Sequence, residues 1–538
     1  MARFNVLYER WIPVEDQTGR VEELSLLEVL ERAENPRVTG SGRPALVAIN
    51  DPAPPIQFGL YRLLIAFIQD ALPVRTVTDL TNLYKQGRFD MAAVERYVAK
   101  VGEQRFDLFD PEWPFLQSPP GPDDAKSTVS VANLFFHLPT GTNVIHFHHA
   151  YEDGQAIAPA VCARALTAIA PFMTAGGRGY SPSVNGSPPW YVLVRGETLF
   201  ETLLLNCCVM PLGLPGDTPV AWRSREPVVP GQERPCRSLG EGFTWQPRRV
   251  RLIPGEGGRC TYSGVESPVL VREIVYGPGY KHAEGDGWID PNVAYVESDR
   301  RQPLRPREDR ELWRDIGPLM LLRKEDYRTE DGRISYSRPL VVTQVRRLKE
   351  ERRIPRTTHE VVEVYGMRVD KAKVFEWQCE RLALPEAVAA LPDAGRQVQR
   401  ALETAERLAG GLRSALKLAY PRGGKSNQRA FERLIQTAVA AYWAELHDEF
   451  RTFYIPALAA LDPGDLDARA RLAAQWLDRA QAAGSRALEL ALDSLDSDAD
   501  ALARQVQARQ HFHRVVAGLR GEGAGKERRR GERRQRRG

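Results

Sequence analysis

The sequence lacks several features that would place it in a class at once. None of its 538 residues lies in an apolar run near the roughly 18 residues that a membrane span needs. The opening MARFNVLYERW has no hydrophobic stretch of a secretory signal. We therefore expect a protein that stays in the cytoplasm and has no membrane partner. Its few cysteines are scattered, as expected of reduced structural thiols: Cys162, Cys207, Cys208, Cys236, Cys260 and Cys379.

Motifs of common hydrolases and nucleotide-binding enzymes are also missing. There is no GxSxG, no HExxH and no paired-carboxylate motif in a recognisable setting. The segment 423–426 (GGKS) matches the end of a P-loop, but the first glycine of that motif would fall at Ala419, inside a predicted helix. Ser426 fits better as a helix N-cap. The sequence therefore predicts no cofactor and no catalytic set.

One cluster could still hold a metal. His146, His148 and His149 precede Glu152 and Asp153, and such side chains could ligate a metal for nuclease chemistry. In a strand, however, alternation would put His149 on the opposite face from the other two histidines. No second set of ligands completes the site, and Cys236 is too far from Cys260 for zinc-knuckle spacing. A metal-dependent nuclease using residues 146–153 remains the alternative from another class.

Lysine is scarce, and arginine replaces it. The chain has 74 Lys and Arg residues together and a net charge of only +4, so its average charge does not indicate a nucleic-acid-binding protein. The arginines instead gather in the segments 300–328, 346–356 and 528–537. Clustered guanidinium groups suit phosphate contacts, because each is always charged and can donate two hydrogen bonds at once. A solvated surface is the competing interpretation for each cluster.

The way the composition changes along the chain predicts an α+β protein. In that prediction, a large mixed α/β part of irregular topology precedes a four-helix bundle. Up to about residue 379, Pro and Gly interrupt short helix-like runs and strand-like runs at 192–194, 250–253, 269–275 and 340–345. Residues 380–520 are rich in Ala, Leu, Arg, Glu and Gln. In the basic tail, 521–538, the only apolar side chain is Ala524, so we expect disorder there.

The bundle helices follow from apolar spacing. After the N-cap candidate Asp393, apolar residues from Val398 to Ala419 recur in steps of four and three, which places them on one stripe of a helix. A second helix is expected from about 426 to 446, a third from Asp465, and a fourth ending near Arg520. Short links between these segments favour antiparallel neighbours.

A glycine-punctuated loop, FMTAGGRGYSPSVNGSPP at 172–189, lies between the helix-like run 157–171 and the strand-like run 190–194. Without a Cβ, Gly176, Gly177, Gly179 and Gly186 allow the backbone positive φ angles and close approach to a flat or grooved ligand. An ordinary connector is the competing interpretation. The Arg-rich segments and the missing catalytic set favour a ligand.

Landmarks along nearly the whole chain resemble the CasA family, the large subunit of the type I-E CRISPR surveillance complex called Cascade. The family's opening is matched by FNVLYERWIPV at 4–14, and later segments follow in family order. These are WPFLQS at 113–118, LFFHLPTGTNV at 134–144, the glycine loop, VRGETLFETLLLNCC at 194–208, FTWQPRRVRL at 243–252 and YGMRVDKAKVFEW at 365–377.

The resemblance implies a non-enzymatic subunit with several partners. In the family it lies near the 5′ end of the guide RNA among other Cascade subunits and recognises the protospacer-adjacent motif (PAM) in double-stranded DNA. It then starts strand separation and recruits a separate helicase-nuclease. A purely architectural subunit, whose loops contact only protein, is a further alternative.

The resemblance also implies site residues. The family reads the PAM from the minor groove with a glycine loop, a lysine finger and a wedge hairpin. On this sequence they correspond to Gly176, Gly177, Gly179, Tyr180 and Asn185, to Lys281, and to Val369, Asp370 and Lys371. A loop that anchors the subunit to the guide and to its neighbours corresponds to Phe136, His137, Thr140, Gly141, Thr142 and Asn143. Relatives can carry glutamine in place of Lys371, and some have clustered cysteines where this chain has only Cys260.

Overall fold

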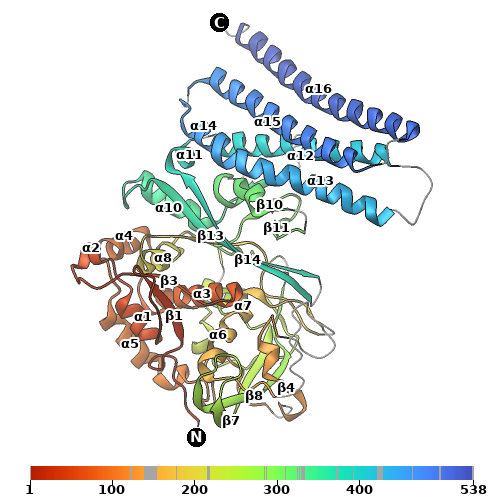
Figure 1. Ribbon diagram of the computed structural model, residues 1–538. Coiled ribbons are helices and arrows are strands. Elements are labelled where there is room, and N and C mark those ends of the chain that lie inside the picture. Colours follow the sequence, from red (N-terminus) through yellow and green to blue (C-terminus); the bar gives the residue numbers. More distant parts are fainter. Residues whose placement is uncertain are drawn as a thin grey trace. The chain divides into compact units, whose positions relative to one another are not determined.

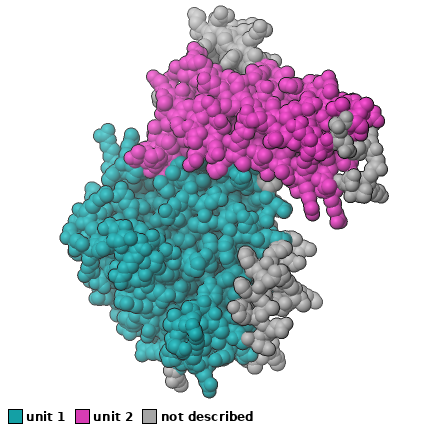
Figure 2. Space-filling view, in the orientation of Figure 1, with its two compact units in different colours: residues 1–357, 361–383 teal, residues 358–360, 384–538 magenta. Residues whose placement is uncertain are grey.

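The chain folds into two compact units, coloured separately in Figure 2. One comprises residues 1–357 and 361–383, and the other residues 358–360 and 384–538. The computed structural model describes residues 2–121, 124–138, 154–176, 179–214, 218–283, 285, 287–308, 310–323, 325, 328, 334–370, 373–391, 393–420, 428–462, 464–495 and 498–535. The predicted α+β class is confirmed, since a mixed unit precedes a helical one.

Short helices make up much of the first unit (Figure 1). The longest of them, α3, is buried along most of its length and forms the centre of the core. Several of the others begin at side-chain caps that the sequence supplies, such as the capping boxes at Ser25 and Thr76. The helices are α1 (Leu26–Arg32), α2 (Pro36–Thr39), α3 (Pro54–Ala71), α4 (Val77–Gln86), α5 (Met91–Val101), α6 (Pro159–Thr167), α7 (Ile169–Phe172), α8 (Leu199–Leu205), α9 (Leu239–Phe243) and α10 (Leu340–Glu350).

The strands form small separate sheets. Their orders are β2-β1-β3, β4-β8-β7, β14-β13-β5, β11-β10-β12 and the parallel pair β6-β9. The bounds are β1 (Ile12–Asp16), β2 (Val21–Leu24), β3 (Leu46–Ile49), β4 (Thr128–Ser130), β5 (Tyr191–Val194), β6 (Glu233–Arg234), β7 (Arg248–Arg259), β8 (Glu266–Pro278), β9 (Lys281–His282), β10 (Tyr295–Glu297), β11 (Arg301–Pro303), β12 (Ser335–Ser337), β13 (His359–Asp370) and β14 (Lys373–Pro385). The strands predicted at 192–194, 250–253 and 269–275 are confirmed.

The strand expected at 340–345 is wrong, because the segment is helical in α10. Its buried apolar residues continue past the predicted end as Val341, Val342, Val345 and Leu348, a spacing that lines one face of a helix. The β-branched valines suggested a strand, but propensity is a weak preference that packing overrides.

The second unit contains the expected four-helix bundle. The bundle consists of α12 (Ala394–Ala419), α13 (Gln428–Glu449), α15 (Leu466–Asp493) and α16 (Ala499–Gln535), and short helices α11 (Glu386–Ala390) and α14 (Ile455–Ala459) accompany it. Helix α12 packs against the other three, with its predicted stripe buried. Trp476 Nε1 and Tyr442 OH donate to the α12 carbonyls of Ala401 (2.8 Å) and Ala405 (2.9 Å). Asp393 is the N-cap residue, but its carboxylate pairs with Arg469 (2.7 Å) rather than with the helix backbone.

The end of α16 differs from the sequence expectation. Residues from 521 onward were expected to be disordered, whereas the helical backbone continues to Gln535. Arg, Lys, Glu and Gln have favourable helix propensities, so a segment whose only apolar side chain is Ala524 can still be helical. Among the described residues, no helix is both long and apolar enough to cross a membrane.

Candidate nucleic-acid interface

The glycine loop leaves α7 and returns to β5. Gly176 is half-buried, and Gly179 is exposed with a φ of +86°. A Cβ at Gly179 would lie 3.7 Å from Pro278, an ordinary contact, so the left-handed backbone alone makes glycine favourable there. Gly186 also has positive φ, at +75°. Gly177 lies outside the described residues.

A single buried arginine holds both ends of this loop. Arg248, at the start of β7, is only 3% exposed. Its guanidinium donates to the carbonyls of Thr174 and Ser181, on either side of the glycines. The Tyr180 ring stacks on Tyr276 and lies 4.9 Å from the Arg248 guanidinium. The loop is therefore fixed at its base, with its glycines on a rigid support.

Asn185 supports the loop from inside. It is 6% exposed, and its amide nitrogen donates to Tyr191 OH (3.1 Å) and to the Asp290 carboxylate (2.7 Å). Its side-chain oxygen accepts from Trp288 Nε1 (2.7 Å). Because the amide is engaged on both sides by buried protein groups, this geometry gives Asn185 a positioning role.

Lys281 belongs to a segment that contacts the glycine loop through Pro278 and Trp288. It begins β9, which pairs with β6. The Lys281 side chain is 56% exposed and pairs with Glu233 (2.7 Å). Two contacts join its segment to the loop: Pro278 faces Gly179, and Trp288 donates to Asn185. The glycine loop and the residues on either side of Lys281 are thus in contact, although they lie far apart in the sequence.

The third predicted element is a β-hairpin, β13–β14. Strand β5 pairs with β13 only from Val362 to Tyr365, so the remainder of β13 forms a two-stranded ribbon with β14 (Figure 1). Val369 is half-buried near the tip, and Asp370 ends β13. Lys371 lies outside the described residues, as does the side chain of Asp370.

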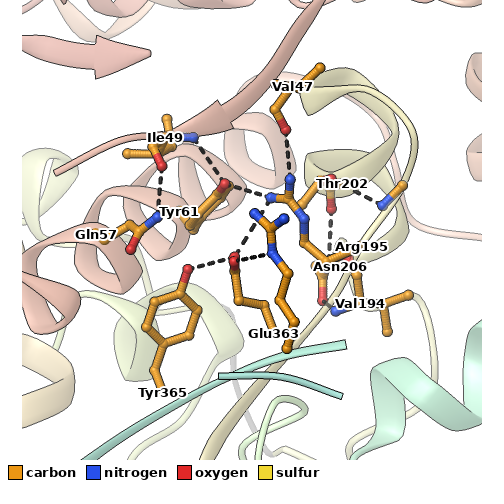
Figure 3. Close-up of polar contacts among 12 residues, drawn as sticks. Val47, Ile49, Gln57, Tyr61, Val194, Arg195, Thr202, Asn206, Glu363 and Tyr365 are labelled. Atoms are coloured by element: carbon orange, nitrogen blue, oxygen red, sulfur yellow. Dashed lines mark hydrogen bonds and ion pairs between the residues drawn. The ribbon is translucent and has the colours of Figure 1, made fainter. Parts of the chain in front are cut away.

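A buried polar network fixes the root of the hairpin (Figure 3). Glu363 of β13 accepts hydrogen bonds from Tyr365 OH (2.7 Å) and from Arg381 Nε of β14 (3.0 Å). Arg195 lies 3.7 Å from the same carboxylate and donates to Tyr61 OH (2.7 Å). Both strands of the ribbon are therefore connected to the core around α3.

The base of the anchoring loop packs against the hairpin. His137 Nε2 lies 3.1 Å from Tyr262 OH, and the His137 ring is edge-on to Trp377 of β14 at 5.2 Å. Burial lowers the pKa of the His137 imidazole to about 4. Phe136 is half-buried beside it. Thr140, Gly141, Thr142 and Asn143 lie outside the described residues.

Neither metal hypothesis gains support from the described residues, where no group of three or more His, Cys, Asp and Glu side chains comes together. The cluster 146–153 lies outside them. Cys260 is buried, and its Sγ accepts from the backbone N–H groups of Ala158 (3.3 Å) and Ser263 (3.4 Å).

Sequence reasoning missed Arg248, Asp290 and Glu363, which position the candidate site. Each is a charged residue next to an apolar strand run, and that pattern is a weak signal of burial. Only the tertiary contacts show what each of them supports.

Comparison with known proteins identifies the family of this chain. A family described as "CRISPR-associated protein Cse1" matches residues 5–487. The chain belongs to the Cse1 family. The predicted resemblance to CasA is thereby confirmed, since a Thermus thermophilus structure carries both names, CasA and Cse1.

Solved Cse1 structures share this fold over nearly the whole chain. Cse1 from Acidimicrobium ferrooxidans is 22% identical, with a TM-score of 0.72 over 97% of this chain and 99% of that one. Thermus thermophilus CasA (Cse1) is 25% identical, with a TM-score of 0.69 over 96% and 100%. A chain from a "CRISPR RNA-guided surveillance complex" is 20% identical, with a TM-score of 0.69 over 96% and 100%. Among curated proteins, none matches significantly.

Proposed function

We propose that this chain is the large, non-catalytic subunit of a type I-E Cascade complex. It recognises the PAM in double-stranded DNA, starts strand separation for guide-RNA pairing and recruits a helicase-nuclease. Membership of the Cse1 family and the fold shared with a chain of an RNA-guided surveillance complex support this role. The loop at 136–143 is the proposed anchor to the 5′ end of the guide RNA and to neighbouring subunits.

The observation that carries the proposal is the contact between the glycine loop and the segment that contains Lys281. The minor groove is narrow and its base edges are nearly degenerate, so a protein reads it by close backbone approach and by a few long cationic side chains. The exposed backbone at Gly179 allows the close approach, and Lys281 supplies the cationic side chain. Asn185 is not included among the DNA contacts, because its amide is engaged inside the protein.

The β13–β14 ribbon is the proposed wedge. Opening the duplex costs about 1.4 kcal/mol per base-pair step, and pairing with the guide offsets that cost as the heteroduplex extends. A wedge must therefore be rigid at its root, and the Glu363 network supplies that rigidity. No covalent bond is made or broken in this cycle.

A glycine substitution tests the proposal. In the assembled complex, Gly179→Val should weaken binding of PAM-containing duplex at least tenfold, because the side chain and the strained backbone move the loop from the groove. Guide-RNA assembly should not change. Gly19→Val is the matched control, since Gly19 has a similar φ of +82° and open space around it.

Electrophoretic mobility shifts with PAM and PAM-free duplexes report the result. Equal PAM affinity in the Gly179 and Gly19 variants would refute the role of the loop. A purely architectural subunit predicts that equality.

A further inference from the structure

The segment 346–356, one of the arginine clusters of the sequence, borders an open pocket of about 690 Å³ in the first unit. The pocket lies where the end of α10 and the residues after it meet α4 and α2. Its basic lining residues are Lys85, Lys349, Arg352, Arg353 and Arg356. The other lining residues are Val38, Tyr84, Ile354 and Pro355, so no carboxylate from the described part of the chain lines the pocket.

Among the described residues, three of these five cations have no acidic partner, namely Lys85, Arg352 and Arg356. Arg353 Nε lies 3.7 Å from Glu351, whose carboxylate is already bound by Arg347 at 2.7 Å. Lys349 is buried and donates to Thr357 Oγ1 (3.0 Å). Within the described part of the chain, the exposed side chains of Lys85, Arg352 and Arg356 make no ion pair. The pocket therefore carries a net positive charge that is open to solvent.

Helix capping does not account for this concentration of charge. Cations are stabilised near the C-terminus of α10, but the effect fades within the last turn. The same effect applies to Lys85 in the last turn of α4, but it does not explain Arg356, which lies well past the end of α10.

The backbone at the helix end is unusual as well. Arg352 has a φ of +56°, in the left-handed position after a helix that glycine normally occupies. The turn is held by hydrogen bonds from Arg352 N to Lys349 O (3.1 Å) and from Arg353 N to Leu348 O (2.8 Å). An arginine thus stands where the backbone favours glycine, next to a pocket that its guanidinium lines.

We propose that this pocket binds consecutive phosphates of a nucleic-acid backbone. Guanidinium groups bind phosphate oxygens in pairs and stay charged at any physiological pH. None of the lining residues belongs to the glycine loop, Lys281 or the hairpin. The site is therefore a second contact, independent of PAM reading, and its test does not depend on the proposed function. A free polyphosphate offers the same chemistry, so the experiment separates the two sources.

The test compares charge-matched variants of the full-length chain. Arg352→Gln/Arg356→Gln removes two cations from the pocket, and Arg20→Gln/Arg43→Gln removes two from exposed positions that do not line it. Fluorescence anisotropy measures binding of a PAM-free duplex and of a single-stranded RNA over a range of salt concentrations. The slope of log affinity against log salt should fall by about 0.9 per lost phosphate contact on duplex, so by about 2 in the pocket variant. The surface variant should change it far less.

A single substitution separates binding from folding. Arg352→Gly suits the left-handed backbone, so its melting temperature should be no lower than that of the wild type. Its salt slope on duplex should still fall by about one unit. In a second experiment, calorimetry measures the binding of inorganic tripolyphosphate to the wild type and to the pocket variant.

Two results would overturn the proposal. Equal slopes for the pocket and surface double variants, with both duplex and RNA, would exclude a nucleic-acid contact here. If the slopes are equal but tripolyphosphate binds the wild type and not the pocket variant, the site serves a small polyanion instead.

Discussion

At the residue scale, the candidate interface depends on side chains that never reach the surface. Arg62 and Asp290 form a buried pair at 2.6 Å, with both side chains almost wholly inaccessible. The Asp290 carboxylate also accepts from Asn185, which supports the glycine loop. The Arg62 guanidinium lies 4.2 Å from the Phe243 ring, so an aromatic face covers part of a cation whose Nε and Nη1 have no hydrogen-bond acceptor.

We predict that Asp290→Asn lowers the free energy of unfolding by about 3 kcal/mol. The change leaves the Arg62 charge buried without a counterion, and that loss exceeds the value of the intact pair. Urea denaturation followed by tryptophan fluorescence measures it. Asp299→Asn, at an exposed position, is the control and should change stability by less than about 0.5 kcal/mol. Equal losses in the two variants would contradict the prediction.

We also predict a pH-dependent stability that arises at His137. Its pKa in the folded protein is about 4, below the ordinary value of 6.5, because the imidazole is buried. The unfolded chain therefore binds a proton first on acidification, and this contribution to stability is lost as the pH falls from about 6.5 to 4. His137→Gln should show a weaker decrease in stability than the wild type between pH 7 and pH 5. Denaturation curves of both proteins with the same pH dependence would exclude this assignment.

At the element scale, we expect β9 and the glycine loop to recognise the PAM together. We predict that Lys281→Ala costs roughly 1 to 3 kcal/mol of binding on a good PAM and much less on a PAM-free duplex. Lys281→Arg should retain more of the affinity, since it keeps a cation beside Glu233. Titration of both duplexes with the assembled complex measures the difference. An equal loss on both would identify Lys281 as a phosphate contact instead.

The bundle helices could be predicted from sequence because each carries a stripe of the helical period. Val398, Leu402 and Leu412 are buried on α12 as that period requires. Helix α10 could not be predicted in this way, because its first turn contains valines that also suit a strand. For the site, the sequence and the family resemblance predicted Gly179 and Lys281 but not the contacts between their segments. Those segments are held by Arg248, Trp288 and Asp290, whose contacts connect distant parts of the chain.

At the scale of the whole molecule, the second unit has a core of its own. Trp476, Tyr442 and Tyr454 are buried within it, and all three donate hydrogen bonds to carbonyls of α12. Close helix approach depends on small residues, since a Cβ at Gly484 would lie 2.5 Å from Phe512. The helices of the bundle therefore pack against one another through their own side chains.

We predict that a fragment spanning residues 384–520 folds alone into a helical protein. Circular dichroism should show strong minima at the helical wavelengths and a cooperative thermal transition. Gly484→Leu in the same fragment should lower the melting temperature by several degrees, because the added side chain overlaps with Phe512. A coil spectrum, or a transition that is not cooperative, would show that the unit needs the remainder of the chain.

The contacts of Arg248 with Thr174 and Ser181 have a consequence for how this surface can diversify. The two carbonyls that it binds are fixed to the β7–β8 ribbon, whatever residues lie between them. Substitutions between these two carbonyls that keep Gly179 and Tyr180 can therefore leave the ends of the segment in place. If the loop reads DNA as proposed, such substitutions would alter the DNA preference of the subunit without loss of its fold.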